Sequence, residues 1–170
     1  MAGSSLLAAP SRFLIVTLGG RYLAFDAESI AGVCTLEEAG CRDDPTMLGL
    51  VYRTVKLADR LRISNDQDAA NTRIVLLAEQ GVRGSIRVTA VQGMLDLHPS
   101  QVLPLPPHFR GPERRWYQGM ILFKNSIVLA LNTMWVLDEQ ESSAEGSRGQ
   151  DTISRLVATP KISVNDRRVC

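Results

Sequence analysis

The chain has 170 residues, enough for one domain with a substantial core or for two very small domains. Apolar residues make up 45% and charged residues 22%, as in soluble globular proteins, which excludes a wholly disordered chain. A net charge of +1 and an aromatic fraction of 5% argue against nucleic-acid binding, which needs a concentrated basic face or exposed rings. No apolar run reaches the roughly 18 residues of a membrane span, so we expect no direct membrane insertion.

The first elements predicted are the two strands of a hairpin. Residues 13–18 and 22–25 are rich in strand-forming side chains and enclose Gly19 and Gly20, which tolerate the positive φ of a tight turn. Residues 26–33 leave this hairpin as a short helical turn or as an extended edge, and so short a segment leaves both open. The polar residues 34–46, broken by glycine and proline, predict a loop.

The next segment, residues 47–63, begins like a strand and ends like a short helix. Leu57, Ala58 and Leu61 have the spacing of one buried helix face. Residues 64–72 consist of turn-forming side chains and predict a surface loop.

A second β-rich half follows this loop. Residues 73–80 and 84–97 predict two strands separated by a turn around Gly81 and Gly84. Further along, residues 119–123 and 127–131 predict another hairpin, whose turn is the sequence KNS.

Between these strands and the last hairpin lies a proline-rich arm, residues 98–109. Four prolines prevent it from completing a β-ladder, so the chain must leave the sheet there. Just before the arm, a period of two predicts that Val91, Leu95 and Leu97 share one face, directed at the core. We expect the arm, which carries Val102, Leu103 and Leu105, to be an internal strap joining two barrels; a PxxP-type ligand is the alternative.

The elements therefore fall into two runs of short strands, about residues 11–63 and 72–138. Many short strands with little helix predict an all-β barrel or a pair of barrels. We interpret residues 1–11 as a flexible N-terminus. Residues 139–170 begin with a stretch rich in Ser, Gly and Glu, which is typical of a disordered linker and tail. Within this tail, residues 153–164 are either a partner-binding peptide or part of a loose end.

The residues that carry chemistry form no recognisable catalytic, cofactor or metal pattern. His98 and His108 both stand beside proline, and the three cysteines lack CxxC spacing, as expected of free thiols in a reducing cytoplasm. An enzyme that uses Cys34 or Cys41 as its nucleophile is a minor alternative. Another is a small barrel that binds nucleic acid through the basic loop 110–116. By elimination, we expect a non-enzymatic surface that binds protein.

Five stretches, in this order, resemble the CheW-like family of chemotaxis coupling proteins and the related regulatory domain of the chemotaxis histidine kinase. The pattern is one of apolar positions with a few glycines, and it covers about residues 12–138. The stretches are RFLIVTLGGRYLAFDAESIAGV, DPTMLGLVYR, VKLADRLRI, IRVTAVQGMLDLHPSQVLPLPP and YQGMILFKNSIVLALNTMWVL.

The resemblance implies two packed five-stranded SH3-like barrels with short helical turns, spanning about residues 12–70 and 72–138, with an intertwined arrangement left open. It implies a cytoplasmic, non-enzymatic adaptor recruited to receptor arrays at the inner membrane. The implied partners are the regulatory domain of a chemotaxis-type histidine kinase and the cytoplasmic tip of a methyl-accepting receptor. Four residues fall on family positions that contact partners: Ile30, Val33, Gly49 and Arg53.

The chain departs from the family pattern at several positions. Thr54 follows Arg53 where the family usually has glycine. Lys56, Thr89 and Asn132 stand where the family usually has aspartate, and one of these changes reverses the charge. Since charge complementarity selects partners, we hypothesise a divergent paralogue that serves either an alternative chemosensory system or a restricted set of partners.

Overall fold

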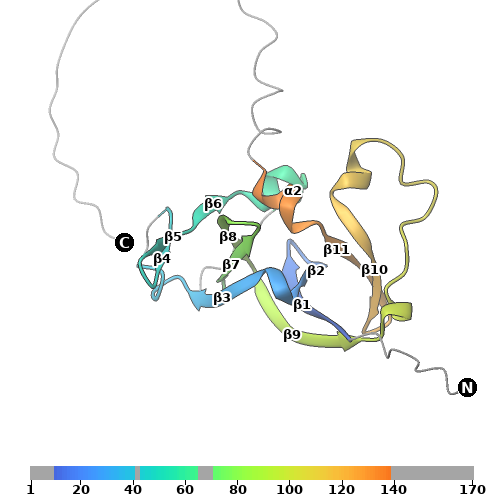
Figure 1. Ribbon diagram of the computed structural model, residues 1–170, viewed down its shortest axis with the longest axis horizontal. Helices are drawn as coiled ribbons and strands as arrows, with labels where there is room; N and C mark the ends of the chain where they lie inside the picture. The colour runs from blue at the N-terminus through green and yellow to red at the C-terminus, as the bar shows by residue number, and fades with distance from the viewer. Residues whose placement is uncertain (1–9, 41–42, 65–70, 139–170) are drawn as a thin grey trace, which may run out of the picture. The chain divides into compact units, whose positions relative to one another are not determined.

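The computed structural model describes residues 10–40, 43–64 and 71–138. The expectations for residues 1–9, for Cys41 and for the tail 139–170 with its segment 153–164 lie outside these described ranges. Figure 1 shows the elements, which in chain order are β1 (Ser11–Leu18), β2 (Arg21–Asp26), η1 (Ala27–Ser29), β3 (Ile30–Thr35), β4 (Thr46–Met47), β5 (Leu50–Val51), β6 (Arg53–Val55), α1 (Leu57–Arg60), β7 (Arg73–Glu79), β8 (Val82–Val88), β9 (Ala90–Leu97), η2 (Pro99–Gln101), η3 (Pro112–Arg115), β10 (Tyr117–Phe123), β11 (Ser126–Leu131) and α2 (Thr133–Leu137).

These elements confirm the predicted all-β fold of small barrels. The first barrel is a five-stranded sheet in the order β10-β11-β2-β1-β9. The second barrel is a four-stranded sheet in the order β3-β7-β8-β6, accompanied by the separate β4–β5 hairpin (Figure 1). Its ladder therefore holds four strands rather than five, because β4 and β5 pair with one another. Each sheet draws strands from both halves of the chain, so the strands are intertwined.

Apolar side chains form three layers, and β1 and β7 are buried on both faces. In β1, Phe13 and Ile15 face the interior of the first barrel, whereas Leu14 and Val16 face the layer between the two sheets. In β7, the odd-numbered residues join that shared layer, and the even-numbered ones join a small core with Tyr52. A strand buried on both faces reads as a continuous apolar run, which explains the unbroken hydrophobic letters of both segments.

The single-face expectation for β9 is wrong at its start. Leu95 packs in the first barrel's interior, and Leu97 is buried there, but Val91 packs against the layer between the sheets. The cause is a register shift opposite Ile15 and Val16, where Gly93 adopts a φ of 132°. A bulge inserts one extra residue and turns the following side chains to the other face.

The proline-rich arm returns to its own sheet instead of crossing to the second barrel. Leu103 pairs with Met120 of β10, so the arm connects the end of β9 to the opposite edge of the five-stranded sheet. Its apolar contact is Val102, which packs against the barrel interior, whereas Leu103 is half exposed. The arm therefore closes the first barrel. The expectation that it joins the two barrels as a strap is wrong.

The turn between β7 and β8 lies at Gln80 and Gly81, both of which have positive φ, as in a type I′ hairpin. Gly84, expected near this turn, lies inside β8 instead. A Cβ atom there would come within 2.5 Å of Leu137 Cδ2, so the missing side chain makes room for α2 to pack on the sheet.

Candidate partner-binding surfaces

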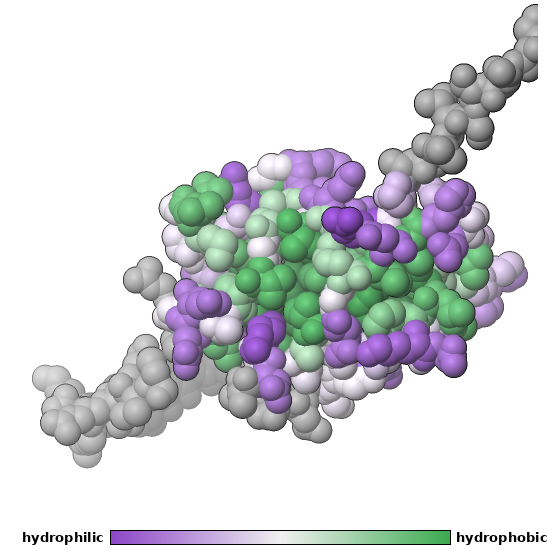
Figure 2. Space-filling view, turned by 90° about the horizontal axis from the view of Figure 1, so that it is seen from below, coloured by the Kyte–Doolittle hydropathy of each residue, from purple (hydrophilic) through white to green (hydrophobic). Residues whose placement is uncertain are grey.

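Exposed apolar side chains gather on the second barrel around the β4–β5 hairpin. The hairpin lies beside β3, because the sulfur of Met47 lies 3.5 Å from where a Cβ atom of Gly32 would be. We call Leu48, Leu50 and Val51 the hairpin surface; their side chains are exposed by 96%, 40% and 59%. Figure 2 shows a hydrophobic protrusion at the end of the view where β4 and β5 lie in Figure 1. Exposed apolar groups gathered in one place indicate an interaction site.

Leu48 stands at the tip of this hairpin in a conformation that leucine disfavours. Leu48 and Gly49 have φ values of 52° and 77°, as a two-residue turn of type I′ requires. Glycine adopts such angles freely, but a leucine there costs on the order of 1 kcal/mol. Because the side chain is also 96% exposed, no packing within the described residues offsets this cost. Strained residues of this kind cluster at binding sites.

The structure distributes the four residues expected to bind partners over different places. Gly49 lies in the turn of the hairpin. Val33, in β3, pairs with Val75, is 41% exposed, and follows Gly32, so its side chain points to the face of the strand opposite the one that Met47 approaches. Ile30, at the start of β3, is partly buried against the layer between the sheets. Arg53 is exposed on β6, whose backbone pairs with β8 at the edge opposite β3. The set therefore does not form one cluster, and of the four residues Gly49 is the one that belongs to the hairpin.

Sequence reasoning missed Leu48, Leu50 and Val51. All three stood in a stretch interpreted as an ordinary strand, where apolar residues are expected to be buried. The available signal was Gly49, which tolerates the positive φ of a turn, but a leucine before it is not among the residues that favour a two-residue hairpin turn. Such a turn reverses the chain and leaves both short strands beside the sheet rather than inside it.

Two of the three positions where the family usually has aspartate are N-cap positions of helices. Asn132 caps α2: its side-chain oxygen accepts from Trp135 N–H at 3.4 Å, and its amide donates to Arg115 O at 3.2 Å. Lys56 occupies the cap position of α1 and makes no side-chain capping bond. The third, Thr89, donates its backbone N–H to Thr17 O at 2.8 Å, but its hydroxyl is buried without a partner. Asparagine therefore supplies a side-chain cap at the start of α2, whereas lysine supplies none at the start of α1.

The two alternative sites are occupied by local contacts. Trp116 in the basic loop stacks on Trp135 with ring centroids 5.1 Å apart, and Arg60 lies 4.5 Å above the Trp135 ring. The face of Trp116 that stacks on Trp135 is therefore not available to a nucleic-acid base. Cys34 is buried in the small core of the second barrel, and burial, assisted by the charge of Glu38, raises the pKa of its thiol. A neutral, buried thiol is a poor nucleophile.

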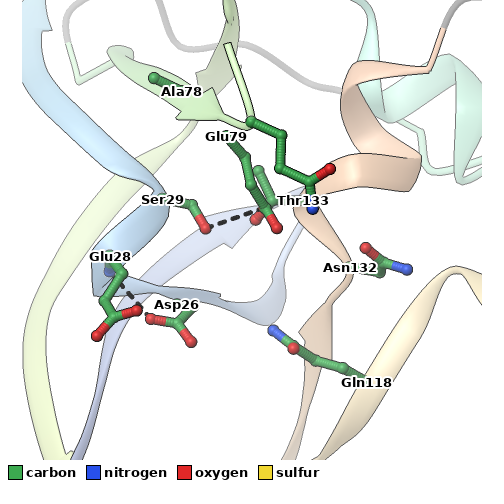
Figure 3. A pocket seen from close by; sticks show the side chains of 9 residues that line it. Asp26, Glu28, Ser29, Ala78, Glu79, Gln118, Asn132 and Thr133 are labelled. Atoms are coloured by element: carbon green, nitrogen blue, oxygen red, sulfur yellow. Dashed lines mark hydrogen bonds between the residues drawn. The ribbon is translucent and has the colours of Figure 1, made fainter. Parts of the chain in front are cut away.

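A polar pocket of about 290 Å³ opens where the two sheets meet (Figure 3). One side comes from the end of β2 and from η1, another from the end of β7, and the third from β10 and the start of α2. Ser29 donates to Glu79 Oε2 across it at 3.3 Å, and Asp26 Oδ1 accepts from Glu28 N–H at 2.9 Å. Its lining residues are Asp26, Glu28, Ser29, Ala78, Glu79, Gln80, Gln118, Asn132 and Thr133.

Two small intertwined β-barrels that share an apolar layer define the class of this protein. A family model described as the CheW-like domain matches residues 12–141, and the chain belongs to that family. Among solved structures, the scaffolding protein TtCheW from Thermoanaerobacter tengcongensis is similar in fold. It aligns with a TM-score of 0.60 and 14% sequence identity over 72% of this chain and 89% of that chain. No curated protein matches the chain.

None of the helices in the described ranges is long and apolar enough to cross a bilayer.

Proposed function

We propose that this protein is a non-enzymatic adaptor of a bacterial chemosensory system, which couples methyl-accepting receptors to a sensor histidine kinase through protein–protein contacts. Family membership supports this role. The single observation that carries it is Leu48, an apolar side chain that is 96% exposed on a strained hairpin tip. In this role the protein works in the cytoplasm, recruited to receptor arrays at the inner membrane.

The hairpin surface is the proposed contact for the regulatory domain of the kinase. Leu48, Leu50 and Val51 offer apolar area that a partner can cover, and at about 25 cal/mol per Å² such area supplies most of the driving force for association. Beside them, β3 is an edge strand of the four-stranded sheet and can pair with a strand of another barrel.

The receptor's helical tip is assigned to the region between the two barrels. Ile30 supports this placement, because it begins β3 where that strand leaves the shared apolar layer. Lys56, Thr89 and Asn132 carry no negative charge where the family usually has aspartate. A partner selected through those charges therefore binds this protein less well, which supports a restricted set of receptors and kinases.

The test is a quantitative binding assay of the full chain against kinase regulatory domains and receptor cytoplasmic tips. Leu48→Asp places a charge on the hairpin tip, and we expect it to weaken kinase-domain binding by more than about tenfold. The matched control is Ile127→Asp on the first barrel, where the native side chain is 70% exposed. If the unmodified protein binds none of these domains, the adaptor proposal is wrong. If both variants lose the same amount of binding affinity, the hairpin surface is not the kinase contact.

A further inference from the structure

The pocket between the sheets carries a concentration of negative charge without a cation. Asp26, Glu28 and Glu79 contribute three carboxylates, and no lysine or arginine is among its lining residues. Across the described ranges, none of these three carboxylates forms an ion pair. Like charges held together repel one another, so the empty pocket is electrostatically unfavourable and a guest cation would relieve it.

Thr133 gives an independent indication that the pocket is incomplete. It is only 2% exposed, it lines the pocket, and its hydroxyl oxygen Oγ1 has no hydrogen-bond partner. Buried hydroxyl groups are almost always paired, because leaving one unpaired costs free energy. Figure 3 shows Thr133 on the wall of the pocket formed by the start of α2.

The side-chain amides of Asn132 and Gln118 already bond to other groups and do not bond to the Thr133 hydroxyl. Asn132 bonds to Trp135 N–H and Arg115 O, and Gln118 donates to Leu131 O at 3.0 Å. The groups left facing the cavity are therefore the carboxylate oxygens, the hydroxyl oxygens of Ser29 and Thr133, and the exposed amide of Gln80, so hydrogen-bond acceptors predominate. A matching guest carries several N–H donors and a positive charge.

We infer that this pocket receives the guanidinium group of an arginine on a partner protein. Guanidinium has five N–H donors in a rigid plane, which suits several acceptors on different walls better than the compact lysine ammonium does. A cavity of about 290 Å³ is at the small end of ligand pockets, so it accommodates a side chain rather than a large metabolite. Across the described ranges there is no group of acidic, histidine or cysteine residues arranged to hold a metal ion.

This inference rests on the proposed adaptor function, because a partner protein supplies the arginine. It adds the chemistry of one contact: Glu79 and Asp26 clamp the guanidinium, and Thr133 Oγ1 accepts one further N–H. None of its lining residues belongs to the hairpin surface, so the two proposed contacts share no residue.

The experiment titrates the full-length, isotope-labelled protein with Nα-acetyl-arginine N-methylamide and follows backbone amide signals by NMR. We expect saturable shifts at Ser29, Glu79 and Thr133. The lysine counterpart binds more weakly, and the neutral citrulline counterpart leaves these signals unmoved. Equal shifts with citrulline or lysine, or no saturable shift with arginine, overturn the inference.

One variant inside the pocket and one control outside it test whether arginine binds there. Glu79→Gln is expected to weaken arginine binding at least about tenfold, the usual result of losing a charge-assisted hydrogen bond. Glu113→Gln removes an exposed acid outside the pocket and leaves binding unchanged. Identical binding by these two variants overturns the inference.

Thr133→Val supplies a readout that a merely structural role would not give. Valine keeps the shape but removes the unpaired hydroxyl, so the melting temperature of the free protein rises while arginine binding weakens. A lower melting temperature, or unchanged binding, overturns the role of Thr133. The titration needs no partner protein, so its failure is distinguishable from failure of the adaptor proposal in the binding assay.

Discussion

Leu103 and Met120 exchange both of their backbone hydrogen bonds, each at 2.8 Å, although 16 residues and a proline-rich arm separate them. This bridge joins the arm that follows β9 to β10, and thereby connects the two edge strands of the five-stranded sheet. An open sheet exposes unpaired backbone groups at both edges, which invites pairing with other chains. The arm covers one edge and makes the first barrel a closed unit.

Gly119→Ala should loosen this closure. A Cβ atom at Gly119 would lie 3.0 Å from Leu103 O and 3.1 Å from Val102 Cγ1, closer than a normal contact. We expect a loss of about 1–3 kcal/mol in the free energy of unfolding, measured by chemical denaturation. The control is Gly32→Ala in β3, where the nearest atoms would be 3.5 and 3.6 Å away. An equal effect of both substitutions would contradict the role of the close approach.

The course of the arm shows which part of the fold could be predicted. Prolines forbid ladder hydrogen bonds, so the sequence alone identified where the chain leaves the sheet. It did not identify the strand to which the arm returns, since this depends on Gly119 permitting the approach of Leu103. The period of two failed at Val91 for a related reason, because a bulge at Gly93 is a tertiary adjustment to β1.

The candidate site was less predictable than the fold. Apolar residues at Leu48, Leu50 and Val51 have the composition of a buried strand, and only their place outside the ladder makes them exposed. The polar pocket combines Asp26, Glu79 and Thr133 from three separate elements. No local pattern links residues so far apart in sequence, whereas hairpins and short helices follow from neighbours in the chain.

Lys56→Asp should stabilise the protein. Lys56 is the cap residue of α1, it is exposed, and its side chain makes no capping hydrogen bond. Aspartate accepts from free N–H groups of the first turn and interacts favourably with the helix dipole, so we expect a gain of about 0.5–1 kcal/mol. Denaturation of Lys56→Asp beside Lys56→Ala measures it. If Lys56→Ala raises the free energy of unfolding by the same amount, the effect comes from removal of the lysine and not from capping.

Leu48→Asn should separate stability from binding. Asparagine tolerates positive φ far better than leucine, so relief of strain should raise the free energy of unfolding by about 1 kcal/mol. Little burial is lost, because Leu48 is 96% exposed. Binding to the kinase regulatory domain should fall in the same variant. A destabilised variant, or one with undiminished binding, would show that the leucine serves the hairpin itself.

Cys34 should resist thiol reagents in the folded protein. It is 5% exposed, and burial together with Glu38 raises the pKa of its thiol, so the reactive thiolate is scarce. In a Cys41→Ser, Cys170→Ser background, we expect disulfide reagents to label Cys34 on the order of a hundredfold more slowly than in denaturant. Rapid labelling of the native protein at neutral pH would revive Cys34 as a candidate nucleophile.

Arg12 and Asp96 should make stability depend on pH in the acid range. They pair across β1 and β9, with Arg12 Nε donating to Asp96 Oδ1 at 2.5 Å. This hydrogen bond, opposed by desolvation and assisted by the guanidinium charge, lowers the pKa of Asp96 below its ordinary value of 3.8. A lowered pKa in the folded state means that the contribution is complete above the unfolded pKa and is lost as pH falls through the folded one.

A double-mutant cycle of Arg12→Gln and Asp96→Asn isolates this contribution. We expect a small coupling free energy at neutral pH, which decreases below about pH 4 as Asp96 takes up a proton in both states. Because both side chains are more than half exposed, added salt should weaken the coupling at neutral pH as well. A coupling that persists unchanged in strong acid would show that packing of the two side chains, rather than their charges, holds β1 to β9.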